Sequence, residues 1–207
     1  MRGLIHKDLL NLRDTAKMYV AIMLILVTYC IVRGREVFIP IIATLVLSTV
    51  TSATFTKDSI SHWNKLAVTM PFHRKTIVKS KFLLSFIILM MGFALGTMAI
   101  VTCAVASRMT YQIGFQVLIF GTCIAVCANM IMHSVLFRGA EYIEKMELLT
   151  VISYLLAAAI TLGMTYAIGL LISNRLLSLL ISLVLLLMAM IMALCSCIRV
   201  FEKKDIK

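Results

Sequence analysis

The chain has 207 residues, of which 62% are hydrophobic and 14% are charged, and its formal net charge is +11. Soluble globular domains carry about 45–50% apolar residues, so this composition excludes that class and indicates a protein that crosses a membrane several times. The basic residues lie between apolar runs and form no aromatic-rich basic patch, so nucleic acid is not an expected partner.

Residues 1–17 predict a short amphipathic helix at the membrane interface. Leu4, Ile5, Leu9 and Leu12 are interspersed with charged and polar residues, a pattern typical of helices that lie in the membrane surface. A cleavable signal peptide fits poorly, because the apolar run starts late and carries no small-residue cleavage pattern. We therefore expect an interfacial helix that leads into the first membrane span.

Six apolar runs follow, and together they predict an all-α integral membrane protein. A membrane-spanning helix needs about 20 apolar residues, and the runs are close to this length or longer. The predicted spans are 18–32, 37–55, 82–106, 114–136, 148–172 and 176–198, followed by a tail over 199–207.

The distribution of Lys and Arg predicts the orientation of these spans. One side of the predicted bundle holds 16 of the 20 basic residues, and the other side holds only Arg33, Arg35, Arg108 and Arg175. Because cytoplasmic loops carry the excess of Lys and Arg, both termini and the long connections are expected in the cytoplasm. The outer loops are very short.

The longest polar interval between two apolar runs is 56–81. It predicts an amphipathic helix with Thr56 as its N-cap and Asp58 in its first turn. This helix is expected to end near Met70, because Pro71 disfavours a helical conformation in the residue before it. Its apolar face consists of Ile60, Trp63, Leu66, Ala67 and Met70. Such a helix lies on a membrane or docks into a groove on a soluble partner, although a plain helical connection has the same pattern.

Catalytic and cofactor motifs are missing from the sequence. It contains no Gly-x-x-x-x-Gly-Lys-Ser/Thr phosphate loop and no His-Glu-x-x-His zinc motif, and no acidic residue falls in the middle of a span. We therefore expect no enzyme activity, no metal and no cofactor in this chain. The six cysteines fall in apolar segments and read as small buried residues, and His133 with Asn129 suggests internal hydrogen bonding.

Two predicted spans carry polar stripes at helical spacing. The residues are Thr44, Ser48, Thr51 and Ser52 in the second span, and Tyr154, Thr161 and Thr165 in the fifth. They could line a passage between these spans in paired subunits, or bond to backbone carbonyls and neighbouring helices. In the third span Gly92 and Gly96 permit close helix approach, and the sixth span is expected to face lipid or to pack.

Several motifs along the chain resemble those of one family. They are Gly3–Leu9, which is similar to Gly-Leu-x-x-Lys-Asp-Leu; Asp58 and Trp63; Met70 to Lys75, similar to Leu-Pro-x-x-Arg-Lys; Ser80-Lys81; Phe137-Arg138-Gly139 with 141–145; and the tail from Ser196 to Asp205. Together these motifs resemble the small permease subunits of bacterial ABC-2 type ATP-binding-cassette exporters. Met70 and His73 depart from the commoner Leu and Ser of this pattern.

The resemblance implies a six-span permease in the bacterial cytoplasmic membrane, with an N-terminal elbow helix and a cytoplasmic coupling helix between spans two and three. It also implies separate ATPase subunits that bind ATP and Mg²⁺, a second permease copy or paralogue, and amphipathic or antimicrobial peptides such as phenol-soluble modulins and lantibiotics as cargo. The residues expected to couple to the ATPase are Asp58, Ile60, Trp63, Leu66, Met70, Pro71 and Arg74. Trp63 is the expected anchor, since buried aromatics are frequent hot spots.

Two other functions remain open on the sequence. A membrane immunity or sensor-partner protein would bind without transporting, and co-purification of an ATPase would distinguish it from a permease. An integral membrane enzyme is the third reading, which the lack of paired carboxylates or metal ligands in the spans disfavours.

Overall fold

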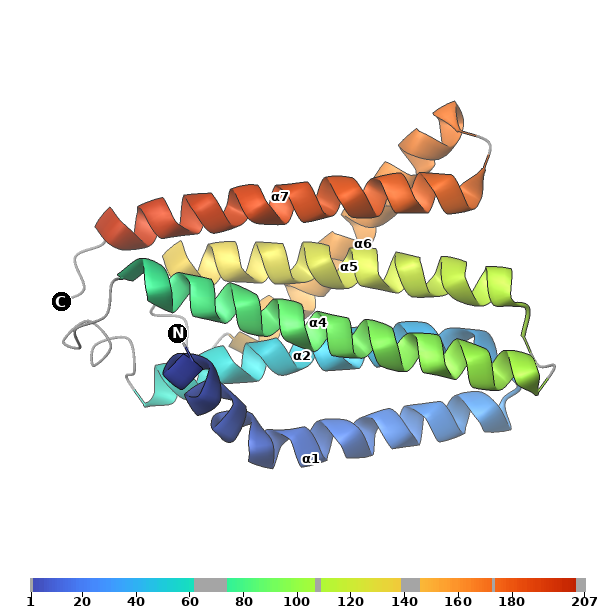
Figure 1. Ribbon diagram of the computed structural model, residues 1–207, viewed down its shortest axis with the longest axis horizontal. Coiled ribbons are helices and arrows are strands. Elements are labelled where there is room, and N and C mark those ends of the chain that lie inside the picture. The colour runs from blue at the N-terminus through green and yellow to red at the C-terminus, as the bar shows by residue number, and fades with distance from the viewer. Residues whose placement is uncertain (1, 62–73, 107–108, 139–145, 173, 204–207) are drawn as a thin grey trace.

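The computed structural model describes residues 2–61, 74–106, 109–138, 146–172 and 174–203, and all regular structure in them is helical (Figure 1). The elements are α1 (Arg2–Val32), the short 3₁₀ helix η1 (Glu36–Phe38), α2 (Ile39–Ile60), α4 (Arg74–Val105), α5 (Tyr111–Arg138), α6 (Met146–Leu171) and α7 (Arg175–Lys203).

Six of these helices are long and apolar enough to cross a membrane, which confirms the predicted all-α, six-span architecture. The candidate spans are Thr15–Val32, Glu36–Asp58, Lys75–Val105, Tyr111–Phe137, Leu148–Leu171 and Arg175–Val200. Each overlaps one of the predicted apolar runs.

The first and second helices differ from the sequence-based boundaries. α1 runs without interruption from Arg2 to Val32, and Figure 1 shows its first turns set at an angle to the rest. The prediction of Thr56 as an N-cap is wrong, because α2 continues to Ile60 and the Thr56 hydroxyl donates back to the Ser52 carbonyl. Asp58 consequently lies in the last turn of α2 and not in the first turn of a new helix.

A glycine ends α1 and turns the chain into the second span. Gly34 has a φ of 63°, a left-handed conformation that glycine adopts without steric cost. Its N–H donates to the Ile31 carbonyl, while the Arg35 N–H donates to the Cys30 carbonyl. This pair of hydrogen bonds is a Schellman cap, and it explains the tight connection between the first two spans.

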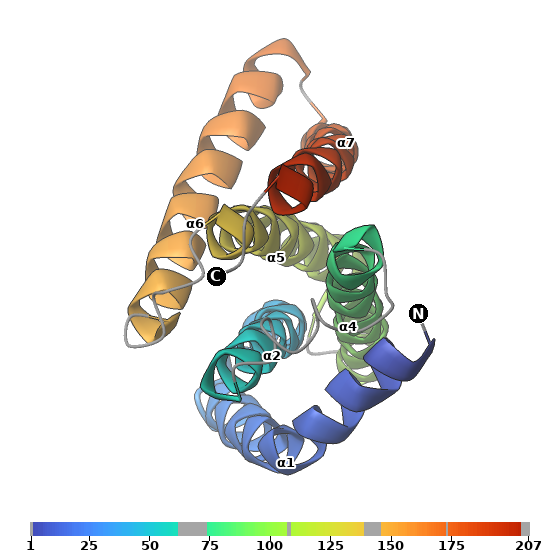
Figure 2. The same ribbon diagram turned by 90° about the vertical axis from the view of Figure 1, so that its left-hand side faces the viewer.

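α5 is the centre of the bundle, and α1 and α6 are at its edge. Of the most apolar stretch of each helix, 67% is buried in α5, 17% in each of α6 and α7, and 6% in α1. The end-on view in Figure 2 shows α2, α4, α6 and α7 around α5, and both views show α6 leaning away from the others. Much of the apolar surface of α6 is therefore not covered by the other helices of the bundle.

Glycines bring α2, α4 and α5 close together, as the predicted pair of small residues indicated. A Cβ on Gly92 would lie 3.2 Å from the Thr44 Cα atom, and a Cβ on Gly96 would lie 3.3 Å from the Pro40 carbonyl oxygen. Gly121 of α5 approaches Ile41 and Thr44 in the same way. These three helices pack backbone against backbone, so their relative positions are tightly constrained.

The cysteines partly follow their prediction as small buried residues. Cys30, Cys123, Cys127 and Cys197 are buried, whereas Cys195 is exposed on α7, and all six are free thiols.

The helix ends that border the 56–81 interval share one side of the bundle with the start of α1. The start of α1, the end of α2, the start of α4 and the ends of α5 and α7 all lie at the left in Figure 1. The end of α1 and the starts of α5 and α7 lie at the opposite side (Figure 1).

Candidate coupling and translocation sites

Four charged side chains meet where α1, α2 and α4 come together, and we call them the ion cluster. Lys81 Nζ lies 3.0 Å from Asp8 Oδ2 and 2.5 Å from Asp58 Oδ2. Lys7 Nζ lies 3.1 Å from Asp8 Oδ1 and 2.5 Å from Asp58 Oδ1. Each lysine therefore bridges both aspartates, and the ion cluster joins three helices.

Local sequence puts each member of the ion cluster in place. Leu4, Asp8 and Leu12 are four residues apart, so they lie on one face of α1, and all three are buried. Asp58 is in the last turn of α2, and Lys81 lies about two turns into α4. A second contact reinforces the junction, since Lys57 Nζ donates to the Asn11 carbonyl of α1.

The electrostatics of the ion cluster require all four charges. The side chains of Asp8, Asp58 and Lys81 are only 2%, 4% and 6% exposed, while that of Lys7 is 25% exposed. Burial of an ion costs several kcal/mol unless it is paired, and two lysines with two aspartates leave no net charge. Removal of one member would leave a buried charge without a full counter-ion.

An aromatic group packs directly beside the ion cluster. Lys81 Nζ lies 5.1 Å from the centroid of the Phe55 ring, within the range of a cation–π interaction. The Phe55 ring meets His133 edge-on at 5.1 Å, and Phe82 meets His133 at 4.5 Å between centroids. Phe137 completes the group, which we call the aromatic floor.

The aromatic floor connects the ion cluster to the central helix. His133 is fully buried on α5, and its Nδ1 lies 2.7 Å from the Asn129 carbonyl oxygen, which confirms the predicted internal hydrogen bonding. The surrounding apolar core extends to Met132 and Leu136 of α5 and to Cys197 of α7. Because of these contacts, a displacement of α2 or α4 at this end would also displace the side chains of α5 and α7.

The structure describes some of the residues predicted to couple to an ATPase, and others lie outside its described ranges. Asp58 lies in the ion cluster, and Ile60, the last residue of α2, is 66% exposed. Arg74 is the first residue of α4. Trp63, Leu66, Met70 and Pro71 lie outside the described residues, so their role stays a prediction.

The polar stripe of α2 is turned inward. Thr44, Ser48 and Thr51 are buried, and Ser52 is half-buried. The Thr44 hydroxyl donates to the Ile41 carbonyl at 2.9 Å and the Ser52 hydroxyl to the Thr49 carbonyl at 2.6 Å. Backbone bonding of this kind, which the sequence left open, accounts for the tolerance of hydroxyls in an apolar helix.

One hydroxyl pair links the two stripes. Ser48 of α2 shares a hydrogen bond with the Tyr154 hydroxyl of α6, which brings together residues 106 positions apart in the chain. Further along α6, the buried Thr161 donates to the Ala157 carbonyl at 2.8 Å, and Thr165 donates to the Thr161 carbonyl at 2.8 Å. The structure thus brings part of the predicted route together, and whether cargo passes there stays a prediction.

Sequence reasoning named Lys7, Asp8 and Lys81 only as parts of motifs and missed that they form one site. A usable signal was present, because Asp8 interrupts a stripe that Leu4 and Leu12 otherwise make apolar. An acid in the middle of a buried face requires a basic partner. Lys7, the next residue in the chain, is one partner, but the buried partner, Lys81, lies on α4, and no spacing rule points to it.

The architecture defines a class of protein. Six apolar helices are long enough to cross a membrane, and the ion cluster lies at one end of the bundle, beside the connection between the second and third spans. These features define a helical membrane protein that crosses the bilayer several times.

The chain belongs to the ABC-2 family of transporter proteins. The profile of the family described as "ABC-2 family transporter protein" matches residues 3–202, nearly the whole chain. This protein is therefore a permease component of an ATP-binding-cassette transporter and not itself an enzyme, and ATP is hydrolysed on a separate ATPase subunit. No curated protein and no solved structure matches the chain.

Proposed function

We propose that this permease exports amphipathic or antimicrobial peptides across the bacterial cytoplasmic membrane, driven by ATPase subunits that contact the 56–81 interval. It acts with a second copy or a paralogous permease, and both of its termini lie in the cytoplasm. The observation that carries the proposal is the ion cluster, which lies at the helix ends that flank the connection between α2 and α4.

The ion cluster fixes the two ends of the 56–81 interval, which we call the coupling interval, relative to α1. Asp58 is three residues before the segment 61–73, and Lys81 is eight residues after it. Asp58 binds Lys7 of α1, Lys81 binds Asp8 of α1, and Asp58 and Lys81 also bind each other, so the two flanks of the segment are held together at one point. A push from an ATPase on this segment would therefore move α1, α2 and α4 as one unit.

The aromatic floor then supplies the route from this unit to the rest of the bundle. Phe55 and Phe82 belong to α2 and α4, while His133 and Phe137 belong to α5. Close-packed interiors transmit displacement because they have little free space. Motion at the cytoplasmic end would reach the central helix through these rings.

The amphipathic cargo is supported by the chemistry of the two polar stripes. Hydroxyls without formal charge accompany apolar side chains in α2 and α6, and a charge at the centre of a span would cost about 2.5–3.5 kcal/mol on insertion scales. Such a surface suits a peptide with one polar and one apolar face. The hydroxyl bond between Ser48 and Tyr154 places the two stripes in contact within one subunit.

The experiment that tests this function uses Trp63, the expected anchor. We expect Trp63→Ala to insert normally but to weaken pull-down of the ATPase or peptide-stimulated ATP hydrolysis, whereas Trp63→Phe, which keeps an aromatic ring, retains more of both. Both quantities are measured on the full-length permease with its ATPase in membranes. Wild-type values for Trp63→Ala in both assays would refute coupling through this residue.

A further inference from the structure

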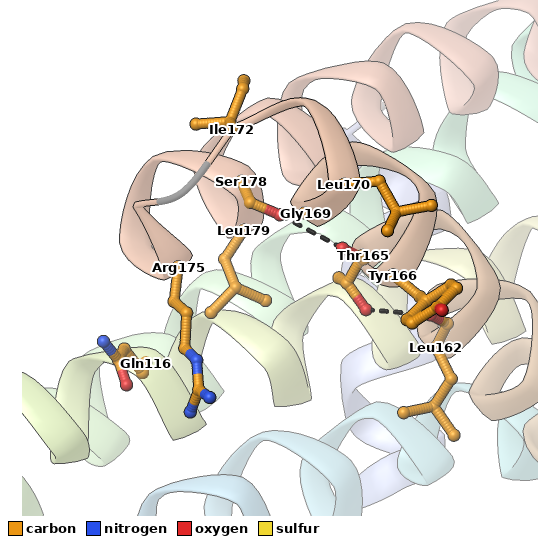
Figure 3. A pocket seen from close by; sticks show the side chains of 10 residues that line it. All are labelled: Gln116, Leu162, Thr165, Tyr166, Gly169, Leu170, Ile172, Arg175, Ser178 and Leu179. Atoms are coloured by element: carbon orange, nitrogen blue, oxygen red, sulfur yellow. Dashed lines mark hydrogen bonds between the residues drawn. The ribbon is translucent and has the colours of Figure 1, made fainter.

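A pocket of about 610 Å³ lies at the end of the bundle away from the ion cluster, between the start of α5, the end of α6 and the start of α7. Figure 3 shows the residues that line it: Gln116 from α5; Leu162, Thr165, Tyr166, Gly169 and Leu170 from the end of α6; Ile172, which directly follows α6; and Arg175, Ser178 and Leu179 from α7. Its volume is in the range of small-molecule sites, about 300–1,000 Å³.

The lean of α6 opens this pocket. A Cβ on Gly169 would meet no atom within 4 Å, so the helix face at this level has no close neighbour. The back of the pocket is closed where the Ser178 hydroxyl donates to the Thr165 carbonyl at 3.3 Å, which joins α7 to α6 (Figure 3). The space is therefore bounded by three helices and open at one side.

The lining combines one cation with neutral polar groups and an apolar wall. Among the described residues that line it, Arg175 is the only charged one, and Gln116 and Tyr166 add donors that an anionic oxygen could accept from. In Figure 3 the guanidinium of Arg175 extends toward α5 on the side where Gln116 lies. Leu162, Leu170 and Leu179 supply the apolar part.

Arg175 has no internal counter-ion in the part of the chain that the structure describes. The ion pairs between described side chains that join Lys7 and Lys81 to Asp8 and Asp58 lie at the opposite end of the bundle. The described residues that line the pocket include no carboxylate. The guanidinium, which presents a planar set of donors suited to carboxylate and phosphate, is therefore available to an external anion.

We propose that this pocket binds the anionic head of an amphipathic molecule, a carboxylate or a phosphate, with the attached apolar chain along Leu162, Leu170 and Leu179. Two sources carry this chemistry: a peptide with a free C-terminal carboxylate, and an anionic phospholipid. Binding to this pocket is measured without transport, so a failure of this proposal can be distinguished from a failure of the proposed export function.

The test measures binding to the full-length permease in nanodiscs of phosphatidylcholine. The probes are a fluorescent amphipathic peptide with a free C-terminal carboxylate, the same peptide as its C-terminal amide, and fluorescent phosphatidylglycerol compared with fluorescent phosphatidylcholine. Because Arg175 is exposed, we expect the anionic member of at least one pair to bind only about fivefold more tightly than the neutral one. The pair that shows the preference identifies the source of the anion.

Matched variants assign the preference to the pocket. Arg175→Gln should abolish it, while Arg33→Gln, an exposed arginine at the same end of the bundle, should retain it. Gly169→Leu should fill the pocket and weaken binding of the preferred probe, while Gly163→Leu, also in open space on α6 but outside the pocket, should not. No anion preference in either pair, a preference that survives Arg175→Gln, or wild-type binding by Gly169→Leu would overturn the proposal.

Discussion

Lys81 is the residue on which the charged end of the bundle depends most. It is 4% exposed, and it bridges one aspartate of α1 and one of α2 from its position on α4. Val78 and Phe82, which are near it in the sequence of α4, are buried, and its ammonium group lies 5.1 Å from the Phe55 ring centroid. A charged lysine in such surroundings is stable only when it is paired with its counter-ions. Its removal should therefore weaken the packing of α1, α2 and α4.

We expect Lys81→Met to destabilise the permease by about 3–5 kcal/mol, because two buried aspartates would then share Lys7 alone. Thermal unfolding in detergent, followed by size-exclusion chromatography, measures the effect. Lys79→Met is the matched control, since Lys79 is exposed on the same helix and should change stability by no more than about 0.5 kcal/mol.

The pairing itself is tested by the double variant Lys81→Met with Asp58→Asn. It leaves Lys7 and Asp8, which are 3.1 Å apart and remain neutral together. Its loss of stability should be smaller than the sum of the two single losses, because neutral removal of a pair leaves no unpaired charge. Additive losses, or equal effects of Lys81→Met and Lys79→Met, would contradict the account of the ion cluster.

At the scale of elements, hydrophobic periodicity and length were sufficient to predict all six spans. An apolar run that is long enough to cross a membrane indicates a spanning helix whichever helices pack around it. For this reason the six predicted runs match the six candidate spans. The boundary at Thr56 was wrong because a polar interval resembles a helix start, whereas α2 continues through it for one more turn. The ion cluster depends on which helices become neighbours, and no single helix pattern contains that information.

The same limit applies to the polar stripes and to the packing glycines. Gly92 and Gly96 were recognisable as small residues four apart, but the partners, α2 and α5, became known only from the structure. The positions of Thr44 and Ser48 likewise showed that they share one face of α2, but not that Ser48 forms a hydrogen bond with Tyr154 of α6.

Close approach of α2 and α4 is tested at Gly92. A side chain there would meet the Thr44 Cα atom at 3.2 Å and the Ala43 carbonyl oxygen at 3.4 Å, which are backbone atoms that cannot rotate away. We expect Gly92→Val to cost about 1–3 kcal/mol through overpacking. Gly163→Val, where a Cβ meets no atom within 4 Å, should be close to wild type; equal thermal stability of the two variants would contradict the packing described.

For the whole molecule, the even number of spans returns both ends of the chain to one side of the bundle. The same side carries the ion cluster and the helix ends that flank the coupling interval (Figure 1). On the charge bias of 16 basic residues against four, we propose that this is the cytoplasmic side. In this orientation the bundle would present one charged face to an ATPase and short turns to the outside.

This orientation predicts the behaviour of reporter fusions. A reporter that is active only outside the cell should remain silent when fused after Lys207, and it should be active when inserted at the Gly34–Arg35 turn. Expression of both fusions is checked by immunoblotting. An active fusion after Lys207 would contradict the proposed orientation.

The proposed route predicts labelling that depends on turnover. Ser48 is 1% exposed and Thr161 is fully buried, so Ser48→Cys and Thr161→Cys, each in a background without the six native cysteines, should resist polar thiol reagents at rest. During ATP hydrolysis both should become labelled if cargo passes between α2 and α6. Ile191→Cys, 58% exposed on α7, reports on the surface that should not change with ATP. Two thiols that stay inert while Ile191→Cys gains labelling would place the route elsewhere.

The central claim is that the ion cluster transmits ATPase motion to the spans, and the amount of peptide transported per ATP hydrolysed tests it most directly. The measurement uses proteoliposomes that contain the permease with its ATPase, and it compares wild type with the double variant Asp58→Asn, Lys81→Met. We predict that the double variant still binds the ATPase and hydrolyses ATP, but that its transport per ATP falls severalfold, because α2 and α4 are no longer held to α1. An unchanged ratio of transport to hydrolysis in that variant would contradict the account.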